Sequence, residues 1–305
     1  MLKYVLKRLG YILVTLWVIV TCTFFMMKNL PGTPFDAERF SIMTPQQQER
    51  VLEMYGLNDS LPMQYVKYIK NMLKGDLGTS FTYVNQDVSK VITGRLGPSA
   101  LIGIQAVLIG LAIGLILGIL AAWKHNSGID YFTMILAVLG VSVPNFVAAA
   151  LLQYYIGLKW GALPVGFWTG WNCSVLPSIA LSFSATAMVA RFMRTEMLDV
   201  LDQDYIITAR AKGLSQMKVL MRHAVRNSIL PVVTILGPIV VNLMTGSLAV
   251  ENIFSIPGIG SLFVDCIKAN DYPVIMGITI FYAAFYMLIV LLVDLAYSLI
   301  DPRIR

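Results

Sequence analysis

The side chains that could perform acid–base or metal chemistry are few and widely spaced in this chain of 305 residues. The two histidines are His125 and His223, and the three cysteines are Cys22, Cys173 and Cys266. No CxxC or Cys/His metal spacing occurs. We therefore interpret the cysteines as small apolar residues, with a disulfide between Cys173 and Cys266 as the less favoured alternative. Because the sequence also lacks a Gly-x4-Gly-Lys-Ser/Thr phosphate loop, we expect this chain to bind no ATP, cofactor or metal.

Carboxylates are missing from the middle of the apolar runs. Ion-driven carriers place acidic residues there, although a charge in the membrane costs roughly 2.5–3.5 kcal/mol or more. The nearest candidates are Glu251, at the outer end of the fifth run, and Asp294, near the inner end of the sixth. This pattern disfavours an autonomous ion-coupled carrier or channel. Both histidines fall in expected loops, so no histidine within the membrane could act as the general base of a hydrolase. This disfavours an intramembrane hydrolase. Energy for transport is expected to come from another polypeptide.

The composition is that of an integral membrane protein. Hydrophobic residues make up 57% of the chain and charged residues 13%, with a mean hydropathy of +0.71. A soluble domain carries about 25% charged residues, so the numbers exclude a soluble globule and a secreted disulfide scaffold. A helix needs about 20 apolar residues to cross a membrane. The runs that qualify predict an all-α protein with six transmembrane helices, at 9–27, 99–123, 131–158, 173–191, 229–250 and 272–293.

Lysine and arginine predict the orientation, because cytoplasmic loops are enriched in them. They concentrate in the N-terminal segment, in segment 192–228 and at the C-terminus. We expect both termini to be cytoplasmic and the net charge of +6 to reflect topology rather than nucleic-acid binding. The expected parts are 1–30, which includes a retained first helix, an extracytoplasmic loop at 31–98, and a five-helix core at 99–305. The loop at 31–98 is interpreted either as a cap on the outer mouth or as a docking surface for a partner.

Uncharged polar residues within the runs are candidates to line a pathway across the membrane, since they offer hydrogen-bond donors and acceptors without fixed charges. Packing between helices is the commoner role of such residues. Proline at 144 predicts a kink in the third run. Glu251 is a hypothetical partner for a basic residue on a partner helix near the outer gate. The pathway and gate candidates are Pro144, Asn145, Ser182, Asn242, Thr245, Gly246 and Glu251.

Segment 192–228 carries the most information, because it predicts two helices around a break. Gly213 supplies the residue that tolerates a positive φ at a helix C-terminus, and Ser215 is placed to cap the next helix. Arg210 and Lys212 could engage acidic groups. A loop that merely fixes topology would explain the charges but not this break. A protein-docking helix is therefore favoured, and its small residues, which would let a partner backbone approach, are Thr208, Ala209 and Ala211.

An ordered set of motifs across nearly the whole chain resembles the permeases of ATP-binding-cassette importers, in the peptide/nickel group, and within it the B-type membrane subunit of oligopeptide permeases. The cytoplasmic segment resembles their EAA loop, although Ile207 stands in place of its glutamate and Thr208 in place of its first alanine. The motifs are 31–35 (PGTPF) with Glu38-Arg39, 75–81 (GDLGTSF), 204–214 (DYIITARAKGL), 222–227 (RHAVRN) with Leu230-Pro231, 245–247 (TGS), Glu251 with 256–260 (IPGIG), and 301–304 (DPRI).

The resemblance implies a non-catalytic subunit in a bacterial cytoplasmic membrane that forms half of an oligopeptide pathway by alternating access. A dipeptide, nickel or glutathione importer of the same group is the alternative. The implied partners are a second homologous permease, two cytoplasmic ATPase subunits that hold ATP and Mg, an extracytoplasmic peptide-binding protein, the peptide cargo and the bilayer, with no nucleic acid. The residues implied to contact an ATPase are Tyr205, Ile207, Thr208, Ala209, Arg210, Ala211, Lys212, Gly213 and Leu214.

Overall fold

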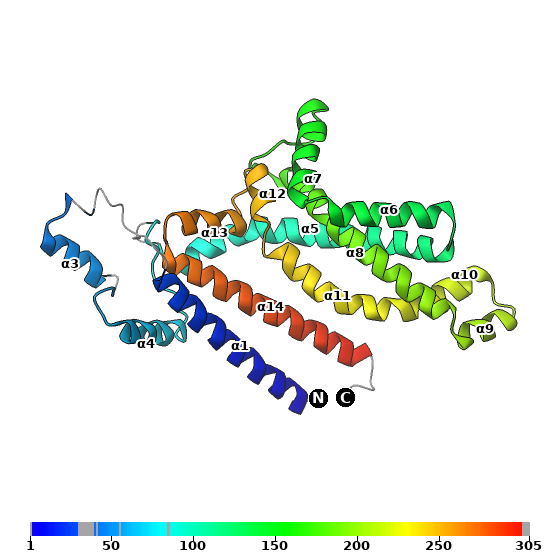
Figure 1. Cartoon of the computed structure of the whole chain (residues 1–305), viewed down its shortest axis with the longest axis horizontal. Helices are drawn as coiled ribbons and strands as arrows, with labels where there is room; N and C mark the ends of the chain where they lie inside the picture. The colour runs from blue at the N-terminus through cyan, green and yellow to red at the C-terminus, as the bar shows by residue number, and fades with distance from the viewer. Residues whose placement is uncertain (1, 30–39, 41, 55, 84–85, 301–305) are drawn as a thin grey trace. The chain divides into compact units, whose positions relative to one another are not determined.

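The computed structural model describes residues 2–29, 40, 42–54, 56–83 and 86–300, with the backbone alone at 2–6, 54, 294 and 296–300. Two of the motifs, at 31–39 and 301–304, lie outside these residues. The described part is helical (Figure 1), with an isolated β-bridge between Thr79 and Asp87. In the first half its helices are α1 (Leu2–Lys28), α3 (Pro45–Met54), α4 (Leu61–Met72), α5 (Val88–Trp123), α6 (Gly128–Ser142), α7 (Asn145–Leu152) and the π-helix η1 (Gln153–Lys159).

The second half of the described chain continues in the same way. Its elements are the 3-10 helix η2 (Trp171–Ser174), α8 (Val175–Leu201), α9 (Asp204–Ala211), α10 (Gln216–Lys218), the π-helix η3 (Val219–Val225), α11 (Arg226–Met244), α12 (Leu248–Ile253), α13 (Ile259–Lys268) and α14 (Tyr272–Ile300). The described residues contain five helices long and apolar enough to cross a membrane, or six if one bent pair counts as a span. The predicted all-α membrane fold is confirmed.

The bent pair is the predicted third run, which turns by 100° between α6 and α7. Pro144 has no N–H to continue the hydrogen bonds of α6, and it forces the residue before it out of the helical region. Val143 accordingly has φ −81° and ψ 117°. The predicted kink at Pro144 is confirmed, and it is large enough to make two separate helices.

Two boundaries differ from the sequence prediction. The second span was expected to begin at residue 99, but α5 begins at Val88 and carries Pro98 inside it. The fifth run was expected to be one helix over 229–250, but α11 ends at Met244 and α12 begins at Leu248. Gly246 lies between them with a φ of +86°, a conformation that glycine adopts without steric cost.

The chain divides into two compact units, Met1–Gly97 with Ser261–Phe285, and Pro98–Gly260 with Tyr286–Arg305. In the first unit α4 packs against α1. The ring of Phe24 lies 5.4 Å from that of Tyr65, and the hydroxyls of Thr21 and Tyr65 are 2.7 Å apart. The amphipathic stretch of the sequence at 65–73 thus lies almost wholly within α4.

The first unit is also held by a buried carboxylate at the start of α14. Asp271 is fully buried and accepts hydrogen bonds from the Ser80 hydroxyl, from the backbone N–H of Phe81 at 3.2 Å and from that of Thr82 at 3.0 Å. It also accepts a bond from the N–H of Val274, at 3.5 Å, as an N-cap residue does. The 75–81 motif therefore ends in a turn that wraps one carboxylate.

In the second unit α8 packs against α6 and α11, which run beside it (Figure 1). Helix α5 approaches α8 through glycines at every fourth position, Gly110, Gly114 and Gly118. A Cβ at Gly118 would lie 2.6 Å from the carbonyl oxygen of Ala190, and one at Gly140 in α6 would lie 2.9 Å from a side chain of α8. Small residues at such spacing let membrane helices pack backbone to backbone, because lipid offers no hydrophobic drive for association.

All three cysteines are free thiols, two of them buried, and the favoured interpretation of Cys173 and Cys266 as unpaired buried residues is confirmed. Burial raises the pKa of the Cys266 thiol to about 12. A thiol that keeps its proton is a poor nucleophile. Cys22, in contrast, is exposed on α1.

An ion pair joins the start of α6 to α8. Arg194 donates from Nε to Asp130 Oδ1 at 2.5 Å and from a terminal nitrogen to Oδ2 at 2.8 Å. The backbone N–H of Asn126 donates to the same carboxylate at 3.0 Å. The Asp130 side chain is 3% exposed and that of Arg194 20%. Two hydrogen bonds between one guanidinium and one carboxylate fix the relative orientation of the two side chains as well as stabilising the contact.

We expect Asp130→Asn to lower the free energy of unfolding by about 3–5 kcal/mol, because it leaves a desolvated guanidinium without its carboxylate. Thermal unfolding of the purified protein in detergent measures the change. The matched control is Lys90→Gln, which breaks the exposed Lys90–Asp87 pair and should cost under about 1 kcal/mol. Equal melting temperatures for the two variants would contradict the prediction.

Candidate functional site

The candidate site is the segment around α9, which begins and ends where the sequence signals lie. Asp204 occupies the first turn, where its charge suits the positive end of the helix dipole. The helix ends at Ala211, and Gly213, two residues later, has a φ of +77°. The Gly213 N–H donates to the Arg210 carbonyl at 2.9 Å and the Leu214 N–H to the Ala209 carbonyl at 3.4 Å. The predicted break is confirmed.

Ser215 precedes α10 with an extended backbone, φ −59° and ψ 147°, and its carbonyl accepts the first bond of the next helix, from the Val219 N–H at 3.0 Å. Its side chain makes no capping hydrogen bond. Ser215 is therefore the N-cap residue in position, but the hydroxyl does not perform the expected capping.

The faces of α9 divide the predicted contact residues into two groups. Ile206 is fully buried and Ala209, one turn later, is 6% exposed, and both belong to the core of the second unit. Ala209 therefore cannot offer its small side chain to a partner, contrary to the expected stripe of small residues. Tyr205 and Ile207 are 42% and 57% exposed. The remaining predicted contact residues are also exposed: Thr208, Arg210, Ala211, Lys212, Gly213 and Leu214.

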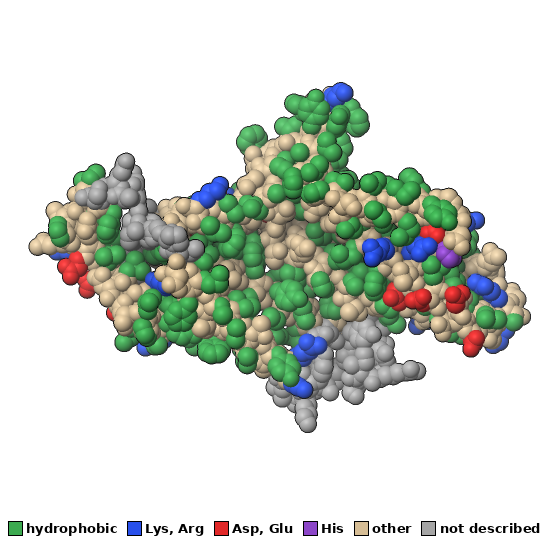
Figure 2. Space-filling model, viewed as in Figure 1, with side chains coloured by type: hydrophobic (Ala, Val, Ile, Leu, Met, Phe, Trp, Pro, Cys, Tyr) green, Lys and Arg blue, Asp and Glu red, His purple; other side chains and the backbone are tan. Residues whose placement is uncertain are grey.

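Apolar side chains continue this surface beyond the break, where Leu214, Met217 and Met221 are exposed. Figure 2 shows charged side chains of both signs gathered over the end of the second unit that carries α9 and α10, whereas apolar side chains dominate elsewhere on this face of that unit. An exposed apolar patch rimmed by charges is typical of a protein contact surface.

The segment is joined mechanically to the fifth run. The helix continues from α10 through η3 into α11, with Pro231 inside α11. The Asn227 side-chain amide donates to the Tyr205 hydroxyl at 3.1 Å, which links α9 to the first turn of α11. The Ser228 hydroxyl donates to the Glu196 carbonyl of α8 at 3.2 Å. A force on α9 therefore reaches two long helices.

Replacing Gly213 with valine should reduce transport several-fold while membrane insertion survives. A Cβ at this position would meet no atom within 4 Å. The penalty is therefore confined to the positive φ, which costs a β-branched residue about 1–3 kcal/mol. Binding-protein-dependent uptake and the amount of protein in the membrane are the two measurements. Gly213→Asn is the control, because asparagine tolerates this conformation; normal uptake by the valine variant would remove the mechanical role of the break.

The candidate pathway residues fall in separate places within the second unit. Pro144 and Asn145 form the bend, and Ser182 lines an apolar cavity of about 980 Å³ between α5, α6, α7 and α8. The Ser182 hydroxyl donates to its own helix, to the Ile179 carbonyl at 2.8 Å. Thr245 does the same, to Val241 at 2.9 Å, and Asn242 is exposed on α11. Their membership of one pathway stays a prediction.

Glu251 is enclosed by its own chain. It is 2% exposed, and its Oε1 accepts a hydrogen bond from the Ser99 hydroxyl at 2.7 Å. Ser99 in turn accepts from the backbone N–H of Ile259 at 2.8 Å. A relay within one chain thus joins α5, α12 and α13. Pairing of Glu251 with a base on a partner helix near the outer gate stays a prediction.

Three glycines make room for this carboxylate. A Cβ at Gly246 would lie 2.6 Å from Glu251 Oε1, and one at Gly260 would lie 3.0 Å from Oε2. A Cβ at Gly258 would overlap both oxygens. The backbone therefore approaches the carboxylate on several sides, which only residues without a side chain permit. Ser99, Gly258 and Gly260 were not among the predicted site residues; the signal for the glycines was the 256–260 motif close to a lone acidic residue.

A multi-pass bundle with a short exposed helix tied to its long helices defines a membrane subunit of a transport system. Residues 114–305 match the family described as binding-protein-dependent transport system inner membrane component, and residues 1–96 match its N-terminal component. The chain belongs to this family, whose members are the non-catalytic permeases of ATP-binding-cassette importers, with ATPase activity on separate subunits.

The chain matches its relatives over full length. It is 46% identical to the dipeptide transport system permease protein DppB of Lactococcus lactis subsp. cremoris, with 100% of both chains covered. It is 43% identical to DppB of Bacillus subtilis, with 100% of this chain and 98% of the relative covered. It is 38% identical to the oligopeptide transport system permease protein OppB of Escherichia coli, again with 100% of both covered.

One solved structure supports the fold. The crystal structure of an amino acid ABC transporter with histidines aligns with a TM-score of 0.52 and 20% identity, over 70% of this chain and 94% of that chain. At this identity the likeness concerns the fold alone. It agrees with the helical bundle of the described residues.

Proposed function

We propose that this chain imports short peptides as one of two permease subunits that form a pathway across the cytoplasmic membrane. The observation that carries the proposal is full-length similarity, at 38–46% identity, to relatives named for dipeptide and oligopeptide transport. Short peptides include the oligopeptides that the sequence analysis favoured. They also include dipeptides, which the names of the relatives at 46% and 43% identity specify.

The proposed assembly contains a second homologous permease, two cytoplasmic ATPase subunits that bind ATP and Mg, and an extracytoplasmic peptide-binding protein. Lysine and arginine in segment 192–228 and near both termini favour a cytoplasmic location for these parts. The loop at 31–98 would then lie outside. The five-helix core at 99–305 would supply half of the pathway and one coupling segment.

In this assembly the exposed face of α9 would sit on an ATPase. Tyr205, Ile207 and Leu214 supply apolar contact, and Arg210 and Lys212 supply charge. Closure of the ATPases would shift α9, and the Tyr205–Asn227 hydrogen bond and the continuous helix into α11 would carry the shift into the bundle. Rigid-body motion of this kind is a common way to switch a membrane pathway between its two openings.

Purification of the chain from its native membrane in mild detergent, followed by mass spectrometry, tests the assembly. Two ATPases with phosphate loops and a second permease should accompany it. Uptake of peptides of two to six residues into cells with and without the chain then defines the cargo. A chain that is recovered alone as a stable homo-oligomer would contradict the proposal.

A further inference from the structure

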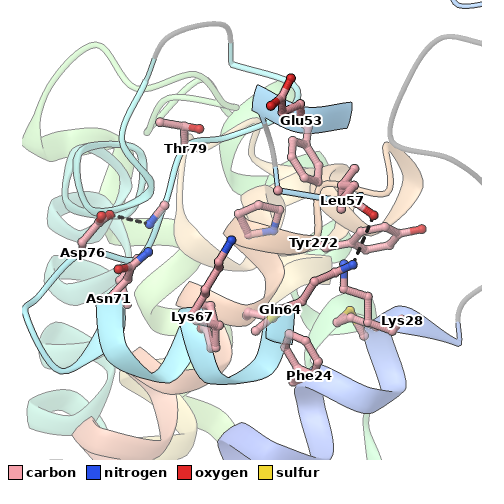
Figure 3. A pocket seen from close by; sticks show the side chains of 18 residues that line it. Phe24, Lys28, Glu53, Leu57, Gln64, Lys67, Asn71, Asp76, Thr79 and Tyr272 are labelled. Carbon is pink, nitrogen blue, oxygen red and sulfur yellow. Dashed lines mark hydrogen bonds between the residues drawn. The ribbon is translucent and has the colours of Figure 1, made fainter. Parts of the chain in front are cut away.

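The first unit contains a cavity of about 360 Å³ that neither the pathway nor the coupling segment uses. Its walls come from the end of α1, from α3 and α4, from the 76–79 turn and from the start of α14 (Figure 3). Phe24, Met27, Tyr272 and Met276 supply apolar surface. The volume falls in the range of about 300–1,000 Å³ that small-molecule sites occupy.

Two hydrogen-bond donors that line this cavity lack acceptors among the described residues. The half-buried Lys28 ammonium lies 5.8 Å from the ring centre of Phe24, and among the described residues it has no carboxylate within ion-pair distance. The ring of Tyr68 packs 5.9 Å from the same Phe24 ring. Its hydroxyl is buried with no hydrogen-bond partner in the described part of the chain. Buried polar groups are nearly always paired, so the unpaired Tyr68 hydroxyl points to a ligand, and the Lys28 ammonium near the same Phe24 ring supplies a positive charge.

The chemistry of these two donors selects an anion. Burial raises the pKa of Tyr68, so the phenol keeps its proton and donates. An ammonium and a phenol that line one cavity, 5.8 Å and 5.9 Å from the centre of the Phe24 ring, suit a carboxylate, to which charge-assisted hydrogen bonds are short and strong. The apolar wall beside them suits a side chain next to that carboxylate.

The side of the cavity opposite Lys28 includes a carboxylate. Asp76 and Asn71 lie across the cavity from Lys28, with Lys67 between them (Figure 3). Lys67 is already paired with Asp59 at 2.6 Å. Asp76 accepts one bond, from the Gly78 N–H at 2.8 Å, and as a carboxylate can accept more. The cavity thus carries charges of both signs, with Lys28 and Asp76 on opposite sides and the carboxylate of Glu53 on a further wall.

We propose that this cavity binds a short zwitterionic peptide, with the terminal carboxylate at Lys28 and Tyr68 and the terminal ammonium toward Asp76 and Asn71. The proposal rests on peptide import as the function and deepens it by placing a receiving site on the first unit. Recognition of the two termini ignores the side chains, so peptides of varied sequence would fit.

Photolabelling of the intact complex in nanodiscs, without the binding protein, tests the site. The probe is alanyl-photoleucine, a diazirine dipeptide, used with a free carboxylate and as the C-terminal amide. The free acid should label residues of α1, α4 or the start of α14, and the amide should label them at least about tenfold less, as expected for the loss of a charge-assisted hydrogen bond. Equal labelling by both probes, or labelling only elsewhere, would overturn the proposal.

Variants connect the label to the two donors. Lys28→Met and Tyr68→Phe should each reduce labelling by the acid about tenfold, with the complex and its ATPase activity intact. Lys70→Met, an exposed lysine on α4 outside the cavity, is the matched control and should change nothing. Undiminished labelling in both test variants would refute the site.

Two further results separate the possible failures. If Lys28→Met weakens recovery of the binding protein but leaves peptide labelling unchanged, the cavity takes an acidic side chain of that protein and the peptide site is wrong. If the wild-type complex with its binding protein and ATP imports no peptide into vesicles, the proposed function itself fails. Normal import with no labelling of the cavity would reject only the receiving site.

Discussion

Gly258→Ala, a single added methyl group, is expected to reduce peptide uptake at least about tenfold. The new Cβ would overlap both carboxylate oxygens of Glu251, which is 2% exposed and cannot swing into solvent without opening the packing around it. Overpacking costs about 1–3 kcal/mol, and displacement of the carboxylate breaks its buried hydrogen bond with the Ser99 hydroxyl, at a further cost of about 1–3 kcal/mol. Uptake and thermal unfolding in detergent measure the two effects.

A second substitution shows whether the clash is the cause. Glu251→Asp withdraws the carboxylate by one methylene, so Gly258→Ala should be less damaging in that background than alone, as a double-mutant cycle would report. Gly128→Ala is the matched control, because a Cβ there meets nothing within 4 Å. If Gly258→Ala keeps wild-type stability and uptake, the packed carboxylate is not needed.

Asp271→Ala is expected to lower the free energy of unfolding by about 3 kcal/mol or more and to release the 75–83 turn from α14. The variant removes an N-cap, worth about 0.5–2 kcal/mol. It also leaves the N–H groups of Phe81 and Thr82 without the carboxylate, at about 1–3 kcal/mol for each group that stays buried. Thermal unfolding and proteolysis at the 75–83 turn are the measurements.

Graded variants separate the contributions. Ser80→Ala removes the hydrogen bond that the hydroxyl donates to Asp271 and the one that it accepts from the Tyr83 N–H at 2.8 Å, and should cost about 1–3 kcal/mol. Asp271→Asn keeps one acceptor oxygen and should fall between alanine and wild type. Asp202→Ala, an exposed acid at the end of α8, is the control and should stay within about 0.5 kcal/mol of wild type. An Asp271→Ala variant as stable as Asp202→Ala would contradict the role of the carboxylate.

The sequence predicted the features that depend on local chemistry. Runs of apolar residues indicate spanning helices, because a helix satisfies its backbone hydrogen bonds internally where the bilayer offers no water. Pro144 lacks an N–H, and Gly213 alone in its segment tolerates a positive φ, so the bend and the end of α9 could be predicted without tertiary contacts. The ordered motifs likewise indicated the family.

Local signals were insufficient where a boundary depends on a distant neighbour. Helix α5 begins eleven residues early, with Val88 packed against Gly277 of α14. At the break between α11 and α12, a Cβ at Gly246 would lie 3.1 Å from the backbone nitrogen of Gly260 and 2.6 Å from the Glu251 carboxylate, so the approach of the 256–260 segment requires glycine there. Ala209 was expected on the exposed face of α9, but only packing against the core decides which face of a short helix is buried.

Two buried carboxylates show most clearly what the tertiary structure alone decided. Ser99 and Glu251 are 152 residues apart in sequence, and Ser80 and Asp271 are 191 apart. No feature of the sequence near either acid indicates which residue will be its hydrogen-bond partner. A carboxylate taken out of water must be hydrogen-bonded, but which hydroxyl or backbone N–H does so depends on which segments the fold brings together. The apolar pattern and the backbone breaks thus follow from the sequence itself, whereas the satisfaction of each buried polar group is a property of the packed bundle.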